Sequence, residues 1–232
     1  MGKLEQAIEI ANPQHPHCAT VLLLDSSGSM AEQDKIGQLN AGLVFFKQDV
    51  STDELARKRV DLAVVTFGET VAVAHGFSSI DAFEPPRLGA AGATPMGEAI
   101  LRGIDLVEER KRDYKQRGVD YYRPWIFLIT DGAPTDMKPT DRTFEEVKRR
   151  IQAGEEERRF LFFAVGVEPA DFATLRQLCP QGREPVQLQR GKFKDLFAWI
   201  SRSQQRVSAS RPGEEVTLES PIGPRGWGKV PN

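Results

Sequence analysis

The strongest restriction on the fold comes from an apolar segment that leads into an acid and two spaced serines. Residues 21–24, Val-Leu-Leu-Leu, lack the polar alternation of a strand with one wet face, so they predict a strand buried on both faces. Such strands occur in parallel sheets covered by helices, and ligands bind at their carboxyl ends. Asp25 ends this strand, and Ser27 and Ser29 follow at alternate positions. One short loop can therefore direct a carboxylate and two hydroxyls toward one point.

These oxygen donors favour a particular metal. Mg²⁺ prefers octahedral oxygen ligation and usually keeps some of its water, so Asp25, Ser27 and Ser29 are candidate ligands for it. A simpler interpretation is also open, because Ser27 and Ser29 could merely cap the helix that follows.

Strands alternate with helices along the rest of the chain. Apolar runs and helical spacing predict further strands at 61–67, 71–74, 125–130, 160–167 and 186–188, and helices at 36–50, 96–115, 143–159 and 192–206, with a short helix after Asp171. The link at 68–70 is too short for a crossover helix, so the strands beside it should be antiparallel. The predicted fold class is α/β: a doubly wound, mostly parallel six-stranded sheet with one antiparallel edge strand and helices on both faces.

A second acid and a threonine extend the predicted site. The buried strand at 125–130 delivers Asp131 to its carboxyl end, and the Gly-rich loop at 84–97 contains Thr94. Two such strands can meet at the switch in strand order, where the loops diverge and leave a crevice. Taken singly, Thr94 could be only the N-cap of the helix that begins with Pro95, and Asp131 could open an ordinary turn.

Three segments together resemble the metal-ion-dependent adhesion site of von Willebrand factor A domains. They are Leu-Leu-Leu-Asp-Ser-Ser-Gly-Ser-Met at 22–30, Gly-Ala-Thr-Pro-Met-Gly-Glu-Ala at 92–99 and Thr-Asp-Gly-Ala-Pro-Thr-Asp at 130–136. More narrowly, they resemble the bacterial TerY-like group, which is linked to tellurium resistance and stress response. The resemblance covers roughly residues 18–205.

The resemblance implies a function and a ligand set. The expected metal ligands are Asp25, Ser27, Ser29, Thr94 and Asp131. The implied cofactor is Mg²⁺ or Mn²⁺, and the implied role is protein binding, in which an Asp or Glu carboxylate of a partner completes the metal shell. A kinase or phosphatase of the same system is an implied partner. The expectation is a binding module and not an enzyme.

Two alternatives remain open at this stage. A metal-assisted phosphatase with Asp25 as nucleophile normally has a second acid two residues later, but this position holds Ser27, which cannot protonate a leaving group. The other alternative is a scaffold whose metal site is vestigial.

Bulk properties limit the remaining function classes. The net charge of −2 gives no basic field for nucleic acid, no apolar run reaches membrane-spanning length, and the start of the chain does not resemble a signal peptide. Two cysteines are too few for a secreted disulfide framework, so a cytoplasmic protein is expected. The predicted organisation is a lead-in at 1–17, one domain at 18–207 and a Pro/Gly-rich tail at 208–232. Trp227 is unusual for a disordered tail and could dock on the domain or on a partner.

Overall fold

The centre of the sheet consists of strands made almost entirely of apolar residues. In the computed structural model, which describes residues 10–223 and 226–231, every residue of β1 (Cys18–Asp25) is buried. The other central strands run parallel to it and are mostly buried: β2 (Val60–Phe67), β4 (Trp125–Thr130) and β5 (Leu161–Val167). Their continuous apolar sequences fit a sheet that is covered on both faces.

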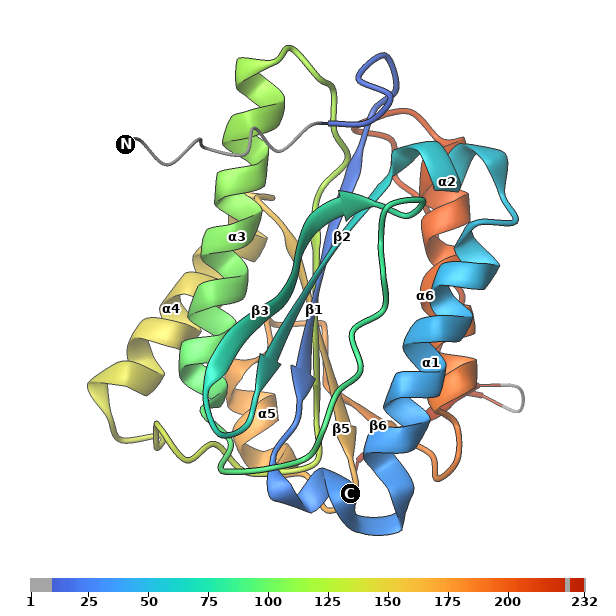
Figure 1. The fold of residues 1–232 in the computed structure, drawn as a ribbon. Coiled ribbons are helices and arrows are strands. Elements are labelled where there is room, and N and C mark those ends of the chain that lie inside the picture. The colour runs from blue at the N-terminus through green and yellow to red at the C-terminus, as the bar shows by residue number, and fades with distance from the viewer. Residues whose placement is uncertain (1–9, 224–225, 232) are drawn as a thin grey trace, which may run out of the picture.

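The sheet has seven strands in the order β3-β2-β1-β4-β5-β6-β7. Figure 1 shows β3 beside β2 at one edge of the sheet. β3 (Val71–Ser79) is antiparallel to β2, as the short link between them predicted, and β6 (Val186–Leu188) continues the parallel part. The predicted doubly wound α/β class is therefore confirmed. The count of six strands misses β7 (Gly228–Lys229), which is antiparallel to β6 at the far edge. β7 has only two residues in a Gly/Pro-rich segment and carries no periodic signal.

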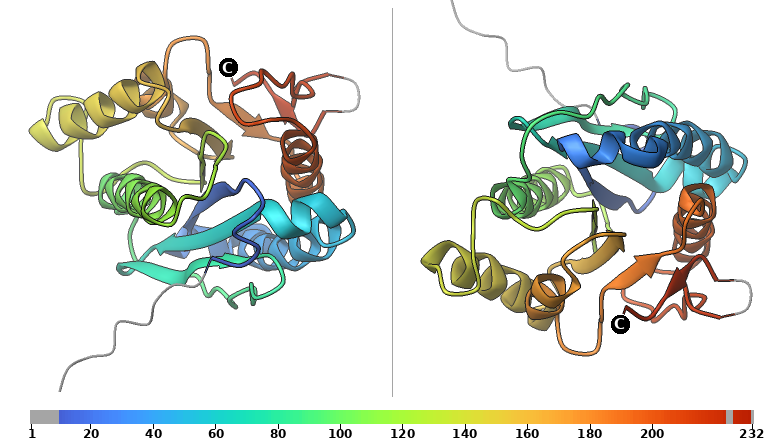
Figure 2. Two further views of the ribbon diagram at one scale, coloured as in Figure 1. Left: turned by 90° about the horizontal axis from the view of Figure 1, so that it is seen from above. Right: turned by 90° about the horizontal axis from the view of Figure 1, so that it is seen from below.

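Helices cover both faces of the sheet. They are η1 (Gly28–Asp34), α1 (Lys35–Val50), α2 (Glu54–Arg59), α3 (Met96–Gln116), α4 (Arg142–Glu156), α5 (Phe172–Leu178) and α6 (Phe193–Ala209). Figure 2 shows α1 and α6 on one side and α3, α4 and α5 on the other. β1 serves both layers, because Leu22 and Leu24 join the core under α1 and α6 while Val21 and Leu23 join the opposite core. Among the described residues, none of the helices has both the length and the apolar composition that a membrane crossing requires.

The direction of winding changes at β1. β2 lies on one side of β1 and β4 on the other, so the chain leaves β1 toward one half of the sheet and returns to the other half. The loops that follow β1 and β4 therefore start as neighbours and diverge, which is where open α/β sheets bind ligands. Asp25 and Asp131 stand at the start of these two loops.

A buried polar cluster lies at the opposite end of the strands. Asp61 of β2 accepts hydrogen bonds from Tyr114 Oη at 2.5 Å and Arg110 Nη2 at 2.6 Å, and its Oδ2 lies 3.2 Å from His17 Nδ1. The side chains of Asp61 and Arg110 are each only 1% exposed. This cluster joins β2, α3 and the segment before β1, far from the candidate site.

The segment after α6 packs on the domain. We call residues 210–223 and 226–231 the C-terminal strap; it lies beside α6 in Figure 2 and ends in β7. Trp227 is buried, and its ring meets that of Trp199 edge-on with centroids 5.7 Å apart. Trp199 Nε1 donates to the carbonyl of Glu219 at 2.8 Å, and Gln189 N donates to the carbonyl of Trp227 at 3.0 Å. The strap thus fills the face of the sheet next to α6.

Candidate metal centre

Asp25 is fixed at the carboxyl end of β1 by two hydrogen bonds. Its Oδ1 accepts from the backbone N–H of Ser27 at 2.8 Å, and its Oδ2 accepts from Thr130 Oγ1 of β4 at 2.6 Å. The carboxylate is fully buried. Burial raises the pKa of Asp25 and the nearby charge of Asp131 raises it further, while the hydrogen bonds from Ser27 and Thr130 act in the opposite direction. A cation beside this carboxylate would offset the cost of burying its charge.

The two serines point toward the loop after β4. Ser27 Oγ and Ser29 Oγ lie 3.1 Å apart, and Ser29 Oγ donates to Asp131 Oδ1 at 2.6 Å. Ser27 occupies the N-cap position of η1, but its side chain makes no capping hydrogen bond. The capping interpretation therefore does not account for these hydroxyls, whereas convergence on Asp131 does.

Asp131 has both of its carboxylate oxygens engaged. Oδ1 accepts from Ser29, and Oδ2 accepts from Lys35 Nζ at the start of α1. Lys35 Nζ also donates to the backbone carbonyl of Ser29 at 3.2 Å. Lys35 has no signal in the sequence, because a lysine in the first turn of a helix normally lies in solvent and the contact spans 96 positions of the chain.

Thr94 lies against the same turn, and it is not the N-cap of α3, which was the alternative interpretation of its position. The N-cap of α3 is Pro95, and Asp136 provides the capping hydrogen bonds, from Gly97 N at 3.1 Å and Glu98 N at 2.8 Å. Thr94 is buried, and its Oγ1 lies 3.2 Å from the position that a Cβ on Gly132 would take. Its hydroxyl is therefore free of the capping role and faces the Asp131–Gly132 turn.

Thr94 is held in place by a reciprocal pair of hydrogen bonds with Thr135. The backbone N–H of Thr94 donates to Thr135 Oγ1 at 3.1 Å, and the backbone N–H of Thr135 donates to the Thr94 carbonyl at 2.9 Å. These bonds join the Gly-rich loop to the loop after β4.

The Gly-rich loop also contacts the loop after β1. The backbone N–H of Gly28 donates to the carbonyl of Gly92 at 3.1 Å, and that of Ala91 donates to the carbonyl of Ser26 at 2.8 Å. Gly92 has φ of +79°, and a Cβ there would lie 2.4 Å from the backbone of Glu69. Glycine is thus required at this position, both for its left-handed conformation and for the close approach. Three loops distant in sequence therefore meet at one place.

The residues brought together fit a hard divalent cation. Two carboxylates and three hydroxyls offer only oxygen, which suits Mg²⁺ or Mn²⁺. Within the described ranges 10–223 and 226–231, no group of three or more His, Cys, Asp or Glu side chains is placed to hold a metal ion. A metal at this site would therefore depend on the serine and threonine hydroxyls and on water, as Mg²⁺ tolerates.

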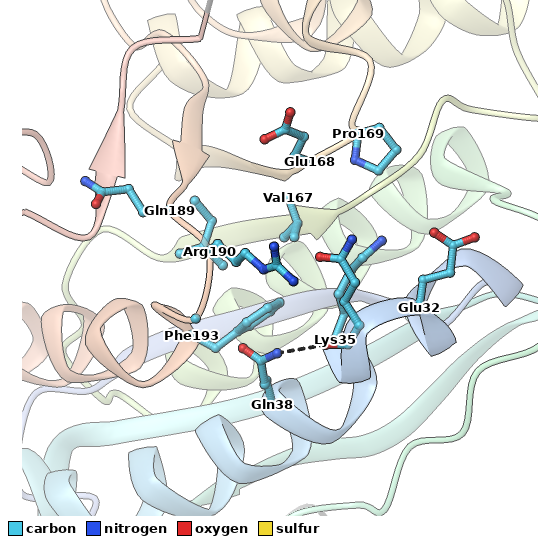
Figure 3. Close-up of a pocket in the computed structure, with 12 residues that line it drawn as sticks. Glu32, Lys35, Gln38, Val167, Glu168, Pro169, Gln189, Arg190 and Phe193 are labelled. Carbon is cyan, nitrogen blue, oxygen red and sulfur yellow. Dashed lines mark hydrogen bonds between the residues drawn. The ribbon is translucent and has the colours of Figure 1, made fainter.

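A pocket of about 420 Å³ adjoins the site through Lys35 (Figure 3). Its walls come from the start of α1 and from the segments after β5 and β6, which contribute Lys35, Glu168 and Arg190 respectively. Lys35 is shared by the two places, because it lines this pocket and its Nζ contacts Asp131, while none of the five candidate ligands lines the pocket.

The open α/β sheet places an Asp-x-Ser-x-Ser segment directly after β1, with Thr94 and Asp131 on neighbouring loops, which is the arrangement expected of a von Willebrand factor A domain. The model of the von Willebrand factor type A domain family matches residues 20–197. Since the match covers more than half of the chain, the chain belongs to this family.

Solved structures of low sequence identity share the fold. The pilus adhesin SpaC from Lactobacillus rhamnosus GG has a TM-score of 0.63 at 13% identity, covering 83% of this chain and 31% of SpaC. The PilB minor pilin from Streptococcus sanguinis has a TM-score of 0.55 at 12% identity, covering 83% of this chain and 62% of PilB. Proximal thread matrix protein 1 from the mussel byssus, solved with a zinc-occupied MIDAS motif, has a TM-score of 0.52 at 16% identity, covering 83% of this chain and 47% of that protein.

This chain thus spans less than two thirds of the length of these structural neighbours. A comparison with curated protein sequences finds no significant match. The family assignment rests on the match of the family model, while the narrower resemblance to the TerY-like group rests on the sequence segments alone.

Proposed function

We propose that this protein binds an acidic side chain of a partner protein through a divalent metal held by Asp25, Ser27, Ser29, Thr94 and Asp131. The observation that carries the proposal is the 2.6 Å hydrogen bond from Ser29 Oγ to Asp131 Oδ1, which joins the loops after β1 and β4 across 102 positions of the chain. A hydroxyl and a carboxylate at this distance can share one small cation after modest adjustment. Asp25 and Asp131 neutralise the charge of Mg²⁺ or Mn²⁺ only nominally, because neutral hydroxyls fill the other protein positions, so a partner carboxylate is a suitable further ligand.

The first experiment tests the metal site on the purified full chain. Isothermal titration with MnCl₂ should give one binding site, and Asp25→Ala should abolish it because this substitution removes a buried carboxylate from the site. Asp81→Ala is the matched control, since Asp81 is exposed and follows β3 at Ser79, which pairs with Asp61 at the opposite end of the sheet. Equal Mn²⁺ binding by Asp25→Ala and the unmodified protein would refute the proposed ligand set.

The second experiment tests the carboxylate requirement with a defined probe. A short peptide with one central glutamate should displace water from Mn²⁺-loaded protein, which lowers the proton relaxation enhancement of the solution. The same peptide with glutamine should have no effect at equal concentration, because a neutral amide is a much weaker ligand for a hard cation. Equal responses to both peptides would contradict recognition through a carboxylate.

We further propose that the protein is a binding module rather than an enzyme. Two residues after Asp25 stands Ser27, whose hydroxyl lies 3.1 Å from Ser29 Oγ and has no useful acidity for protonating a leaving group. Release of phosphate from an aryl phosphate by the pure protein, if lost in Asp25→Ala, would overturn this and favour the metal-assisted phosphatase. Failure to bind any divalent metal would instead favour a scaffold with a vestigial site.

The cellular setting is proposed from the resemblance to the TerY-like group alone. We propose a cytoplasmic role in a tellurite or stress response, with a kinase or phosphatase of the same system as the partner. Deletion of the gene should lower survival in potassium tellurite, and a copy with Asp25→Ala should fail to restore it. Unchanged survival of the deletion strain would contradict this setting without affecting the metal site.

A further inference from the structure

Lys35 places a buried positive charge inside the candidate metal centre. Its side chain is only 5% exposed, and its Nζ donates to Asp131 Oδ2 and to the carbonyl of Ser29. Both acceptors belong to loops that carry predicted metal ligands. An ammonium group is strongly hydrated and is buried only when it is paired, so Asp131 is what retains Lys35 here.

The chain before Lys35 is bent in an unusual way to bring it there. Gln33 and Asp34 have φ of 54° and 56°, a left-handed conformation that residues other than glycine rarely adopt. The Asp34 side chain folds over Gly37, where a Cβ would lie 2.2 Å from Asp34 Oδ1. Two consecutive left-handed residues cost free energy and persist only where the surrounding structure holds them. This turn directs Lys35 inward at the point where η1 passes into α1.

The charges at the site determine how Lys35 affects the binding of a metal ion. Asp25 and Asp131 contribute two negative charges, and Lys35 contributes one positive charge in direct contact with Asp131. A divalent ion that uses Asp131 must either share this carboxylate with the ammonium or displace it. A divalent cation and the ammonium group of Lys35 that both contact Asp131 would repel each other strongly in a partly buried site.

We propose that Lys35 is an internal cation that competes with the divalent metal for Asp131 and thereby sets the metal affinity of the site. This inference rests on the proposed function, because it concerns the same five residues. Lys35 keeps Asp131 paired when no metal is bound, and it weakens metal binding by the chain alone. A partner carboxylate adds the negative charge that Lys35 has cancelled, so metal and partner bind with positive coupling.

The test compares Lys35→Met with the unmodified chain by isothermal titration with MnCl₂. Methionine keeps a long flexible side chain and removes the charge, so Mn²⁺ should bind about tenfold more tightly or better. Lys47→Met is the control, because Lys47 lies on the same helix but pairs with Glu84 at the surface. Its Mn²⁺ affinity should equal that of the unmodified chain.

Thermal unfolding provides a second readout that does not depend on fitting a binding curve. In EDTA, Lys35→Met should melt below the unmodified chain, because Asp131 Oδ2 has lost its partner while Oδ1 keeps only the hydroxyl of Ser29. In saturating Mn²⁺ the order should reverse or the difference should close, so the rise produced by metal is larger in Lys35→Met. Lys35→Gln serves as the second variant if the methionine protein does not fold, and the same results are expected of it.

The outcomes separate this inference from the proposal on which it rests. The competition is refuted if the unmodified chain binds Mn²⁺ and the Lys35 variants show equal or smaller Mn²⁺ affinity and metal-induced stabilisation. The proposed metal site is not affected by that result. Absence of Mn²⁺ binding in every variant overturns both. If Lys35→Met binds Mn²⁺ and the unmodified chain does not, Lys35 excludes the metal completely, which is the strongest support for the competition.

Discussion

Replacing Asp61 with asparagine should lower the free energy of unfolding by about 3 kcal/mol. The carboxylate accepts hydrogen bonds from Arg110 and Tyr114 and lies within 3.2 Å of His17 Nδ1, and the guanidinium of Arg110 is 1% exposed. Breaking a buried pair from one side costs about 3–5 kcal/mol, because the remaining charge cannot return to water. Asparagine keeps one acceptor for these donors, which places the expected value at the lower end.

Urea unfolding followed by circular dichroism at pH 7 measures this effect. Asp105→Asn is the matched control, because Asp105 pairs with Arg150 on the surface, where such pairs contribute at most about 1 kcal/mol. A loss below about 1 kcal/mol in Asp61→Asn would refute the reasoning, since the buried guanidinium would then have found another partner or water.

The pH dependence of the free energy of unfolding, compared between Asp61→Asn and the unmodified protein, gives an independent check. Burial alone would raise the pKa of Asp61, but the hydrogen bond from His17 and the charge of Arg110 outweigh it and hold the pKa below its ordinary value. Stability from ionised Asp61 is therefore complete above the unfolded-state pKa of about 3.9 and is lost as the pH falls through the lower folded-state value. The stability difference between the two proteins should shrink below about pH 4. A difference that stays constant from pH 5 to pH 3 would contradict this.

Three further substitutions test the packing of the domain. Gly42→Ala would place a Cβ 2.3 Å from Phe197 Cδ2, so it should destabilise the contact of α1 with α6 by about 1–3 kcal/mol in urea unfolding. Asp136→Ala removes both capping hydrogen bonds of α3 and should cost about 1 kcal/mol in the same assay. Trp227→Ala removes the ring that packs on Trp199, so trypsin should cut the C-terminal strap faster while the rest of the domain stays resistant.

Each of these predictions has a defined contrary result. Full stability of Gly42→Ala would mean that Phe197 can move at little cost, and an unchanged Asp136→Ala would mean that water replaces the cap. Equal rates of cleavage in Trp227→Ala and the unmodified protein would mean that β7 and the hydrogen bond from Trp199 to Glu219 hold the strap without the ring of Trp227.

The sequence predicted those parts of the site that depend on strands. Asp25 and Asp131 follow apolar runs, and an apolar run at this length indicates a buried strand whose end is where ligands bind. The structure places both at neighbouring strand ends, with Ser29 between them. Their roles as metal ligands, and that of Thr94, stay predictions that the titrations will test.

The parts that the sequence did not predict depend on contacts between distant loops. One such contact is that of Lys35 with Asp131. The other is the cap of α3 by Asp136, which lies 39 positions after Gly97 and 38 after Glu98 and takes the capping role that Thr94 could have had. Neither contact has a local periodic signal, because each is made by a single polar side chain at the end of an element. The seventh strand was missed for a similar reason, since two residues are too few to show alternation.

The short pairing of β7 with β6 has a consequence for how the domain behaves in concentrated solution. An outermost strand with free N–H and carbonyl groups is a template on which a second molecule can add its own strand, and natural proteins cover or interrupt such strands. Here Gly228 and Lys229 occupy those groups on Leu188 and Gln187. A version of the domain trimmed at residue 209 would leave them open beside the uncovered ring of Trp199, so it should self-associate more strongly than the full chain at equal concentration.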